Sequence, residues 1–178
     1  MDFKRNTAGG GSATNESGLT YEQFIENKFI SELETAGCAI DGNKIIKDGR
    51  VYATRYKKHD LYNQLCKDNG IDWKDKISGQ KLPDDAIFVH DTNTLYIIEK
   101  KYQNGYGSND EKIECPLFKI RQYKKLLKDL NIKVEYKYVL SDWFMVENNP
   151  KYRDVFEYHS EIGVEHFFNE LPISVIGL

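Results

Sequence analysis

The chain has 178 residues and a formal net charge of −3, with 40% hydrophobic and 30% charged residues. This composition favours one soluble globular domain with a sizeable core and argues against a protein that coats nucleic acid through bulk positive charge. No apolar run approaches the ~20 residues of a membrane span, and the first residues lack the apolar core of a signal peptide. We therefore expect a cytoplasmic protein with no membrane partner.

The cysteines Cys38, Cys66 and Cys115 are odd in number, lie far apart and form no C-x-x-C pair. This pattern predicts neither a zinc site nor a disulfide framework, and we interpret all three as free, partly buried thiols.

Residues 1–18 are rich in Gly, Ser, Thr and Asn, so we expect a flexible arm before a single domain of residues 19–178. Thr20 and Gln23 have the spacing of a capping box, which predicts a helix that begins at Thr20. Gly37 predicts the end of this helix.

Glu22 lies on the apolar stripe of that helix, in line with Ile25, Phe29 and Leu33. A carboxylate on a stripe that faces the core is a candidate site residue. The simpler interpretation is favourable pairing with the positive end of the helix dipole.

A hairpin pattern, a short helical pattern and a second pair of strands follow. Residues 44–56 predict a hairpin with its turn at Asp48-Gly49, and a short helix is expected to end near Asn69-Gly70. Residues 86–90 and 95–101 predict two further strands joined by a polar turn.

A Ser108-x-x-Glu111 capping box predicts a basic helix that runs to about Asp129. A strand at residues 133–140, a helix at 149–159 and a short final strand near 173–177 complete the prediction. This order of elements requires at least one parallel strand pair, and it predicts an α/β fold with a mixed central sheet flanked by helices.

Two carboxylates and a lysine are the main candidates for catalysis. Asp84 precedes one strand of the second hairpin, and Glu99 and Lys101 end the other. Because strand side chains alternate, Glu99 and Lys101 share a face while Lys100 points the other way. Asp84 can then face Glu99 across the hairpin.

Two carboxylates together with a phosphate oxygen are sufficient ligands for Mg²⁺. Such a metal stabilises charge on a scissile phosphate and lowers the pKa of a bound water, while Lys101 can orient that water or neutralise developing charge. The simpler alternative is a solvated strand end with Asp84 capping a turn.

Pro83-Asp84, the apolar strand and Glu99-Lys100-Lys101 resemble the signature of the PD-(D/E)XK nuclease superfamily. The resemblance implies a restriction-endonuclease-like α-β-β-β-α-β core and a Mg²⁺ cofactor that Mn²⁺ can replace. It also implies that Glu22 assists the metal site formed by Asp84 and Glu99, because a glutamate of the first helix often does so in this superfamily.

The residues after this motif look like those of certain type II restriction endonucleases: Gln103, Gly107-Ser108, Glu111-Lys112 and Gln122-Tyr123. That resemblance implies sequence-specific hydrolysis of phosphodiester bonds in double-stranded DNA, with 5′-phosphate and 3′-hydroxyl ends. It further implies a functional pairing with a cognate DNA methyltransferase. A small chain that cuts both strands of a palindrome is most simply a homodimer.

Several polar and basic side chains are candidate DNA contacts, because phosphate binding requires such groups. They are Gln103, Ser108, Lys112, Lys119, Arg121, Gln122 and Arg55. For the basic residues the alternative is an ordinary solvated face, for Ser108 a helix cap, and for Gln103 a loop-edge position.

Three other functions stay open at this stage. One is a structure-specific or repair nuclease of the same fold, similar to a junction resolvase. Another is a catalytically inert DNA-binding module. The third is a structural α/β protein whose carboxylates meet by chance.

Overall fold

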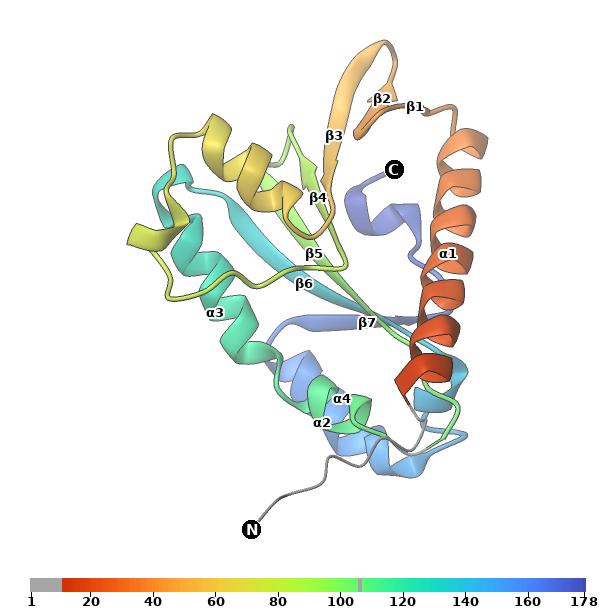
Figure 1. Ribbon diagram of the computed structural model, residues 1–178. Coiled ribbons are helices and arrows are strands. Elements are labelled where there is room, and N and C mark those ends of the chain that lie inside the picture. The colour runs from red at the N-terminus through yellow and green to blue at the C-terminus, as the bar shows by residue number, and fades with distance from the viewer. Residues whose placement is uncertain (1–10, 106) are drawn as a thin grey trace.

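A seven-stranded mixed sheet with helices on both faces forms the centre of the protein in a computed structural model, which describes residues 11–105 and 107–178 (Figure 1). The strands are β1 (Ala39–Asp41), β2 (Lys44–Lys47), β3 (Arg50–Tyr56), β4 (Asp85–Val89), β5 (Thr94–Lys101), β6 (Lys133–Leu140) and β7 (Val164–Phe168). The α-helices are α1 (Gly11–Thr35), α2 (Asn109–Glu114), α3 (Pro116–Leu126) and α4 (Arg153–Glu161). The predicted α/β class is confirmed.

The strands lie in the sheet in chain order, and the pairing changes from antiparallel to parallel at β5. Strands β1 to β5 pair antiparallel with their neighbours, whereas β5, β6 and β7 are parallel. Parallel neighbours need a crossover, which α2 and α3 supply between β5 and β6, and α4 supplies between β6 and β7. The amino end of β4 therefore lies at the same edge as the carboxyl ends of β5, β6 and β7.

Both predicted hairpins are present. Asp48 and Gly49 have φ of 52° and 73°, the positive values that a tight turn between two twisted strands requires. The second hairpin turns at residues 90–93 and pairs Asp85 with Ile98.

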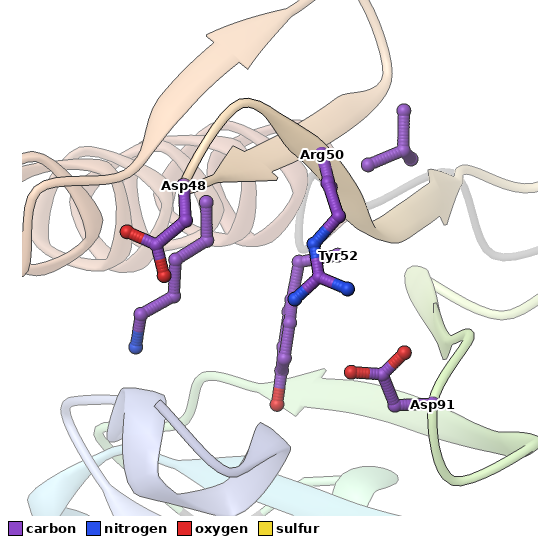
Figure 2. Close-up of a pocket in the computed structure, with 6 residues that line it drawn as sticks. Asp48, Arg50, Tyr52 and Asp91 are labelled. Atoms are coloured by element: carbon purple, nitrogen blue, oxygen red, sulfur yellow. The ribbon is translucent and has the colours of Figure 1, made fainter.

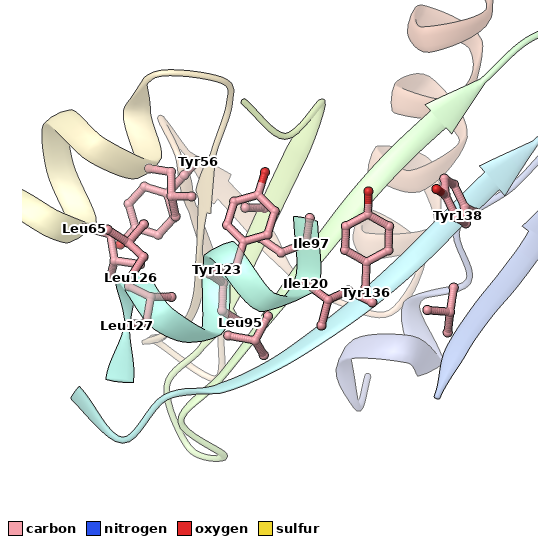
Figure 3. Packing of buried hydrophobic residues seen from close by; sticks show 14 of the residues in the cluster. Tyr56, Leu65, Leu95, Ile97, Ile120, Tyr123, Leu126, Leu127, Tyr136 and Tyr138 are labelled. Atoms are coloured by element: carbon pink, nitrogen blue, oxygen red, sulfur yellow. The ribbon is translucent and has the colours of Figure 1, made fainter. Parts of the chain in front are cut away.

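The sheet separates two apolar cores. On one face, Ile120 and Tyr123 of α3 pack with Leu95 and Ile97 of β5 and with Tyr136 of β6, all of them buried (Figure 3). On the other face, α1 buries a separate cluster that contains Ile98 of β5. Alternation along β5 thus sends neighbouring side chains into different cores, as a strand covered on both faces requires.

Helix α1 buries the predicted stripe of Ile25, Phe29 and Leu33 and ends before Gly37, whose φ is 76°. It begins at Gly11, however, so the prediction of a helix start at Thr20 is wrong. A helix already anchored by packing extends at little cost through polar residues, because only nucleation is costly. Of the expected flexible arm, residues 11–18 belong to α1 and residues 1–10 lie outside the described residues.

The predicted basic helix is two helices, α2 and α3, separated at Cys115. Cys115 has φ −120° and ψ 50°, because Pro116 disfavours a helical conformation in the residue before it. Ser108 stands at the N-cap position of α2, but its side chain makes no capping hydrogen bond, contrary to the predicted capping box.

The predicted final strand near residues 173–177 is wrong. Ile173–Ile176 forms a short 3₁₀ turn after Pro172, and the backbone N–H of Ile173 donates to Glu32 Oε2 at 3.2 Å. The last strand is β7, which was not predicted. A backbone N–H held by a helix side chain is unavailable for a sheet ladder, which explains the turn.

Among the described residues, all three cysteines are free, as predicted; Cys38 and Cys66 are buried and Cys115 is exposed. A short π-helical turn at Leu61–Cys66 occupies the predicted helix before Gly70. In the described ranges, none of the helices combines the length and apolarity needed to cross a membrane.

Candidate active site

Asp84, Glu99 and Lys101 meet at the carboxyl end of β5, on the face that α3 covers. The Lys101 Nζ atom lies 2.9 Å from Glu99 Oε2, 3.4 Å from Asp84 Oδ2 and 3.0 Å from the Lys100 carbonyl oxygen. The ammonium group is therefore surrounded by three oxygen atoms.

The β4–β5 register produces this geometry. Because Asp85 pairs with Ile98, Asp84 falls beside Glu99 at the end of the ladder. The Asp84 carboxylate also accepts a hydrogen bond of 2.7 Å from the backbone N–H of Lys100, which fixes it to β5. The side chains of Lys101 and Asp84 are 14% and 22% exposed, so the cluster opens to solvent on the Asp84 side.

Lys119 of α3 adds a second cation, with its Nζ atom 2.8 Å from Glu99 Oε1. Burial disfavours the charged form of Glu99, but the charges and hydrogen bonds of Lys101 and Lys119 outweigh it and lower the Glu99 pKa. Burial likewise opposes the charge on Lys101, but Glu99 and Asp84 outweigh it and raise the Lys101 pKa. Glu99 is thus an anion and Lys101 a cation near neutral pH.

Buried tyrosines form the floor of the cluster. Burial and the charge of Glu99 raise the pKa of Tyr123, Tyr136 and Tyr138, so all three stay neutral. A neutral, largely apolar floor has a low effective dielectric, which strengthens the electrostatic interactions of the charged groups above it.

The donor set fits a hard divalent cation. Mg²⁺ prefers oxygen ligands and is commonly held by one or two carboxylates, with waters and substrate phosphates as the other ligands. Asp84 Oδ2, Glu99 Oε2 and the Lys100 carbonyl oxygen already surround one cation, the Lys101 ammonium. In the described part of the chain, no group of three or more Asp, Glu, His or Cys side chains suits a metal, so an ion held by Asp84 and Glu99 would need water or substrate as further ligands.

The structure does not bring Glu22 to this cluster. Glu22 is half-buried on α1, and it forms no metal-binding group with Asp84 and Glu99 among the described residues. Helix α1 packs on the face of the sheet opposite to Lys119, as the core around Ile98 shows. Its inward-directed carboxylate is Glu26, one turn further along.

Glu26 belongs to a second charged network on the α1 face. Arg55 Nη1 and Nη2 donate to the two carboxylate oxygens of Glu26 at 2.8 and 2.7 Å, and Nη2 also donates to Asp85 Oδ2. Lys100 Nζ lies 3.9 Å from both carboxylates, which confirms that Lys100 points away from Glu99. Burial disfavours the Glu26 anion, but Arg55, Lys57 and Lys100 outweigh it and lower its pKa to about 2.

Arg55, a candidate DNA contact, is therefore buried and only 7% exposed. Its ion pairs connect β3 to Glu26 of α1 and to Asp85 of β4. Gln103 is also buried: its Nε2 atom donates to Asp110 Oδ1 at 3.0 Å, and its backbone N–H and C=O both pair with the Ser141 hydroxyl. Both side chains are held by protein groups in this structure.

The other candidate contacts lie on the helices after β5. Ser108, Lys112 and Arg121 are exposed, whereas Gln122 is half-buried and its Oε1 atom has no hydrogen-bond partner among the described residues. Lys119 alone among these residues reaches Glu99. The sequence does not single out Lys119 for this contact, because several lysines lie close together in the same basic segment.

A separate cavity of about 330 Å³ lies at the β2–β3 hairpin, and Asp48, Arg50, Tyr52 and Asp91 are among the residues that line it (Figure 2). Asp91 is in the β4–β5 turn, at the end of these strands opposite to Asp84. This cavity is therefore not part of the candidate active site.

Comparison with protein-family models, with curated proteins and with solved structures gives no match to this chain.

Proposed function

We propose that this protein is a Mg²⁺-dependent endonuclease that hydrolyses phosphodiester bonds in double-stranded DNA. The observation that carries the proposal is the position of the Lys101 ammonium, a cation enclosed by two carboxylates and a carbonyl oxygen at the end of a buried strand. A metal-dependent phosphodiesterase needs these oxygens for its ion and a nearby ammonium group for its transition state.

In this proposal, Asp84 and Glu99 hold the ion, which when bound stabilises negative charge on the phosphate and lowers the pKa of a coordinated water. Lys101 moves off the shared oxygens and donates an N–H to the attacking water or to a phosphate oxygen. Because its pKa is raised, it acts as a donor rather than as a general base. Lys119 keeps Glu99 ionised.

The finer assignment is a type II restriction endonuclease with an α-β-β-β-α-β core. The succession of α1, β3, β4, β5, α3 and β6 supports it, since it follows the order expected from the resemblance. Cleavage to 5′-phosphate and 3′-hydroxyl ends, a homodimer and a partner DNA methyltransferase belong to the same proposal.

The test is incubation of supercoiled plasmid and of branched DNA with the protein and MgCl₂. Glu99→Gln should slow cleavage by at least roughly 100-fold, because a catalytic metal contributes several kcal/mol. Glu114→Gln, at an exposed glutamate of α2, is the matched control and should cleave normally.

Discrete plasmid fragments would support a restriction enzyme, and cleavage confined to branched DNA would support a structure-specific nuclease. Binding without cleavage in Mg²⁺ or Mn²⁺ would instead identify an inert DNA-binding module. Full activity of Glu99→Gln would contradict the proposed site.

A further inference from the structure

A cavity of about 580 Å³ lies beyond the carboxyl ends of β5, β6 and β7. Gln103 follows β5, Ser141 follows β6 and Asn169 follows β7, and all three line the cavity. Ligands of open α/β sheets commonly bind outside the carboxyl ends of parallel strands, where the connecting loops diverge. The volume of this cavity is in the range found for small-molecule binding sites.

The cavity shares its backbone with the candidate active site. Gln103 comes two residues after Lys101, and the backbone N–H of Ser141 donates to the Lys101 carbonyl oxygen at 3.1 Å. The cavity and the candidate active site thus lie at the same edge of the sheet, although Tyr21 and Phe24 reach the cavity from the face opposite to Lys119. The inference takes the substrate cleaved at Glu99 to extend along this edge. In this respect the inference rests on the proposed function.

Aromatic side chains make up part of the lining. The Tyr21 and Tyr102 ring centroids are 5.4 Å apart, and Phe24 and Trp143 also line the cavity. Phe24 is 51% exposed, so a large apolar ring near the middle of α1 stays partly in water. A flat ligand that stacks on these rings would remove that apolar surface from water.

Amide and carboxylate groups make up much of the remaining lining, and hydrogen bonds hold them in place. Asn148 Nδ2 donates to the Asp142 carbonyl oxygen at 2.8 Å, Asn149 Nδ2 donates to the Trp143 carbonyl oxygen, and Asn169 Nδ2 donates to Asp142 Oδ1. Each of these bonds uses one of the two N–H groups of its amide, so each amide keeps one N–H donor and an oxygen with two acceptor sites. Together with the Asp142 carboxylate, acceptors therefore outnumber donors among these groups.

Among the described residues that line the cavity, none is a lysine or an arginine, and Asp142 adds a carboxylate. Such a lining does not suit a phosphate group, which needs cations. Aromatic faces with oxygen acceptors suit a nucleobase that carries an exocyclic amine, namely adenine, cytosine or guanine.

From these features we infer that the protein holds one unstacked, amine-bearing nucleobase of its DNA substrate in this cavity. A base reaches such a cavity only when it leaves the helix. The cost of unstacking is smallest for a base that is already unpaired, so the cavity selects DNA that presents one.

The test measures binding without cleavage. A labelled duplex with a single bulged adenine and the same duplex fully paired are titrated with the protein in EDTA, and fluorescence anisotropy gives each Kd. The bulged duplex should bind about tenfold more tightly, since stacking of one base on aromatic side chains is worth roughly that factor or more. A bulged thymine, which lacks the amine, should bind more weakly than adenine.

Phe24→Ala should abolish the preference for the bulged adenine, whereas Phe118→Ala should retain it. Phe118 is a matched control because it is 58% exposed on α3 and does not line the cavity. Both rings are largely outside the core, so both variants should fold, which circular dichroism would verify.

Equal affinity of wild-type protein for bulged and paired duplexes, or no binding to either, would overturn the inference, as would an undiminished preference in Phe24→Ala. Plasmid cleavage in MgCl₂ without a bulge preference would leave the proposed nuclease intact and reject the base cavity. A bulge preference without cleavage would support the base cavity and reject the proposed nuclease.

Discussion

Replacement of Lys101 by methionine tests the candidate metal site most directly, because it removes the ammonium group and keeps most of the side-chain volume. Loss of one partner of a buried ion pair typically costs about 3–5 kcal/mol, and Glu99 is only 3% exposed. Lys119 still pairs with Glu99 at 2.8 Å, so we expect a cost near the lower end, about 3 kcal/mol without metal. For a chain of this size that corresponds to a Tm lower by about 6–12 °C.

Mg²⁺ should restore much of this stability, because the ion would enter an oxygen cluster that has lost its ammonium. A ligand at ~100 times its Kd stabilises a folded protein by about 2.7 kcal/mol. In the wild-type protein the gain should be smaller, since Mg²⁺ must displace Lys101. The assay is urea and thermal unfolding of both proteins with and without MgCl₂.

Lys100→Met is the matched control, because Lys100 is the adjacent buried lysine and its ammonium lies on the opposite face, 3.9 Å from Glu26 and Asp85. It should lose stability that Mg²⁺ does not restore. The reasoning is refuted if Mg²⁺ leaves Lys101→Met unchanged, or if it stabilises Lys100→Met to the same extent.

Three further predictions concern stability. The Glu26 pKa is lowered from 4.5 to about 2, so its ion pairs stabilise the fold above pH 4.5 and are lost as the pH falls towards 2. In urea unfolding, the free energy of unfolding lost over this pH range should be smaller in Glu26→Gln than in the wild-type protein, by about 2 kcal/mol after allowance for solvent screening. Burial lowers the His159 pKa below 6.5, so stability should decline as the pH falls below 6.5, and His159→Phe should decline less; an identical pH profile would contradict this. Gly177 has φ 81°, and a Cβ added there would lie 2.9 Å from Tyr52 Oη. Gly177→Ala should therefore lower the free energy of unfolding by about 1–2 kcal/mol in thermal unfolding. Gly42→Ala should cost less, because a Cβ added at Gly42 has no atom beyond its chain neighbours within 4 Å.

Local patterns account for the parts of the structure that the sequence predicted. Positive φ at Asp48-Gly49 is a property of those two residues, and the alternation that separates Lys100 from Lys101 is a property of any strand. The β4–β5 hairpin follows from such patterns, and with it the meeting of Asp84 and Glu99.

The remaining features depend on tertiary packing. Glu22 and Glu26 are four residues apart and share a helix face, so spacing alone does not show which carboxylate reaches the sheet. The sequence predicts Arg55 as a DNA contact or part of a solvated face, yet it is buried in ion pairs with Glu26 and Asp85. Which face of a sheet a helix covers is decided by contacts distant in sequence.

The change from antiparallel to parallel pairing at β5 has a consequence for the order of folding. The β4–β5 hairpin closes over residues 90–93, whereas β6 reaches β5 only after residues 102–132. Short loops close with a smaller entropy loss, and local contacts form faster than distant ones. We therefore expect the carboxylates of Asp84 and Glu99 to meet early, while the cavity wall after β6 and β7 forms late. A chain arrested between these stages would carry the charged cluster but not the cavity beside it.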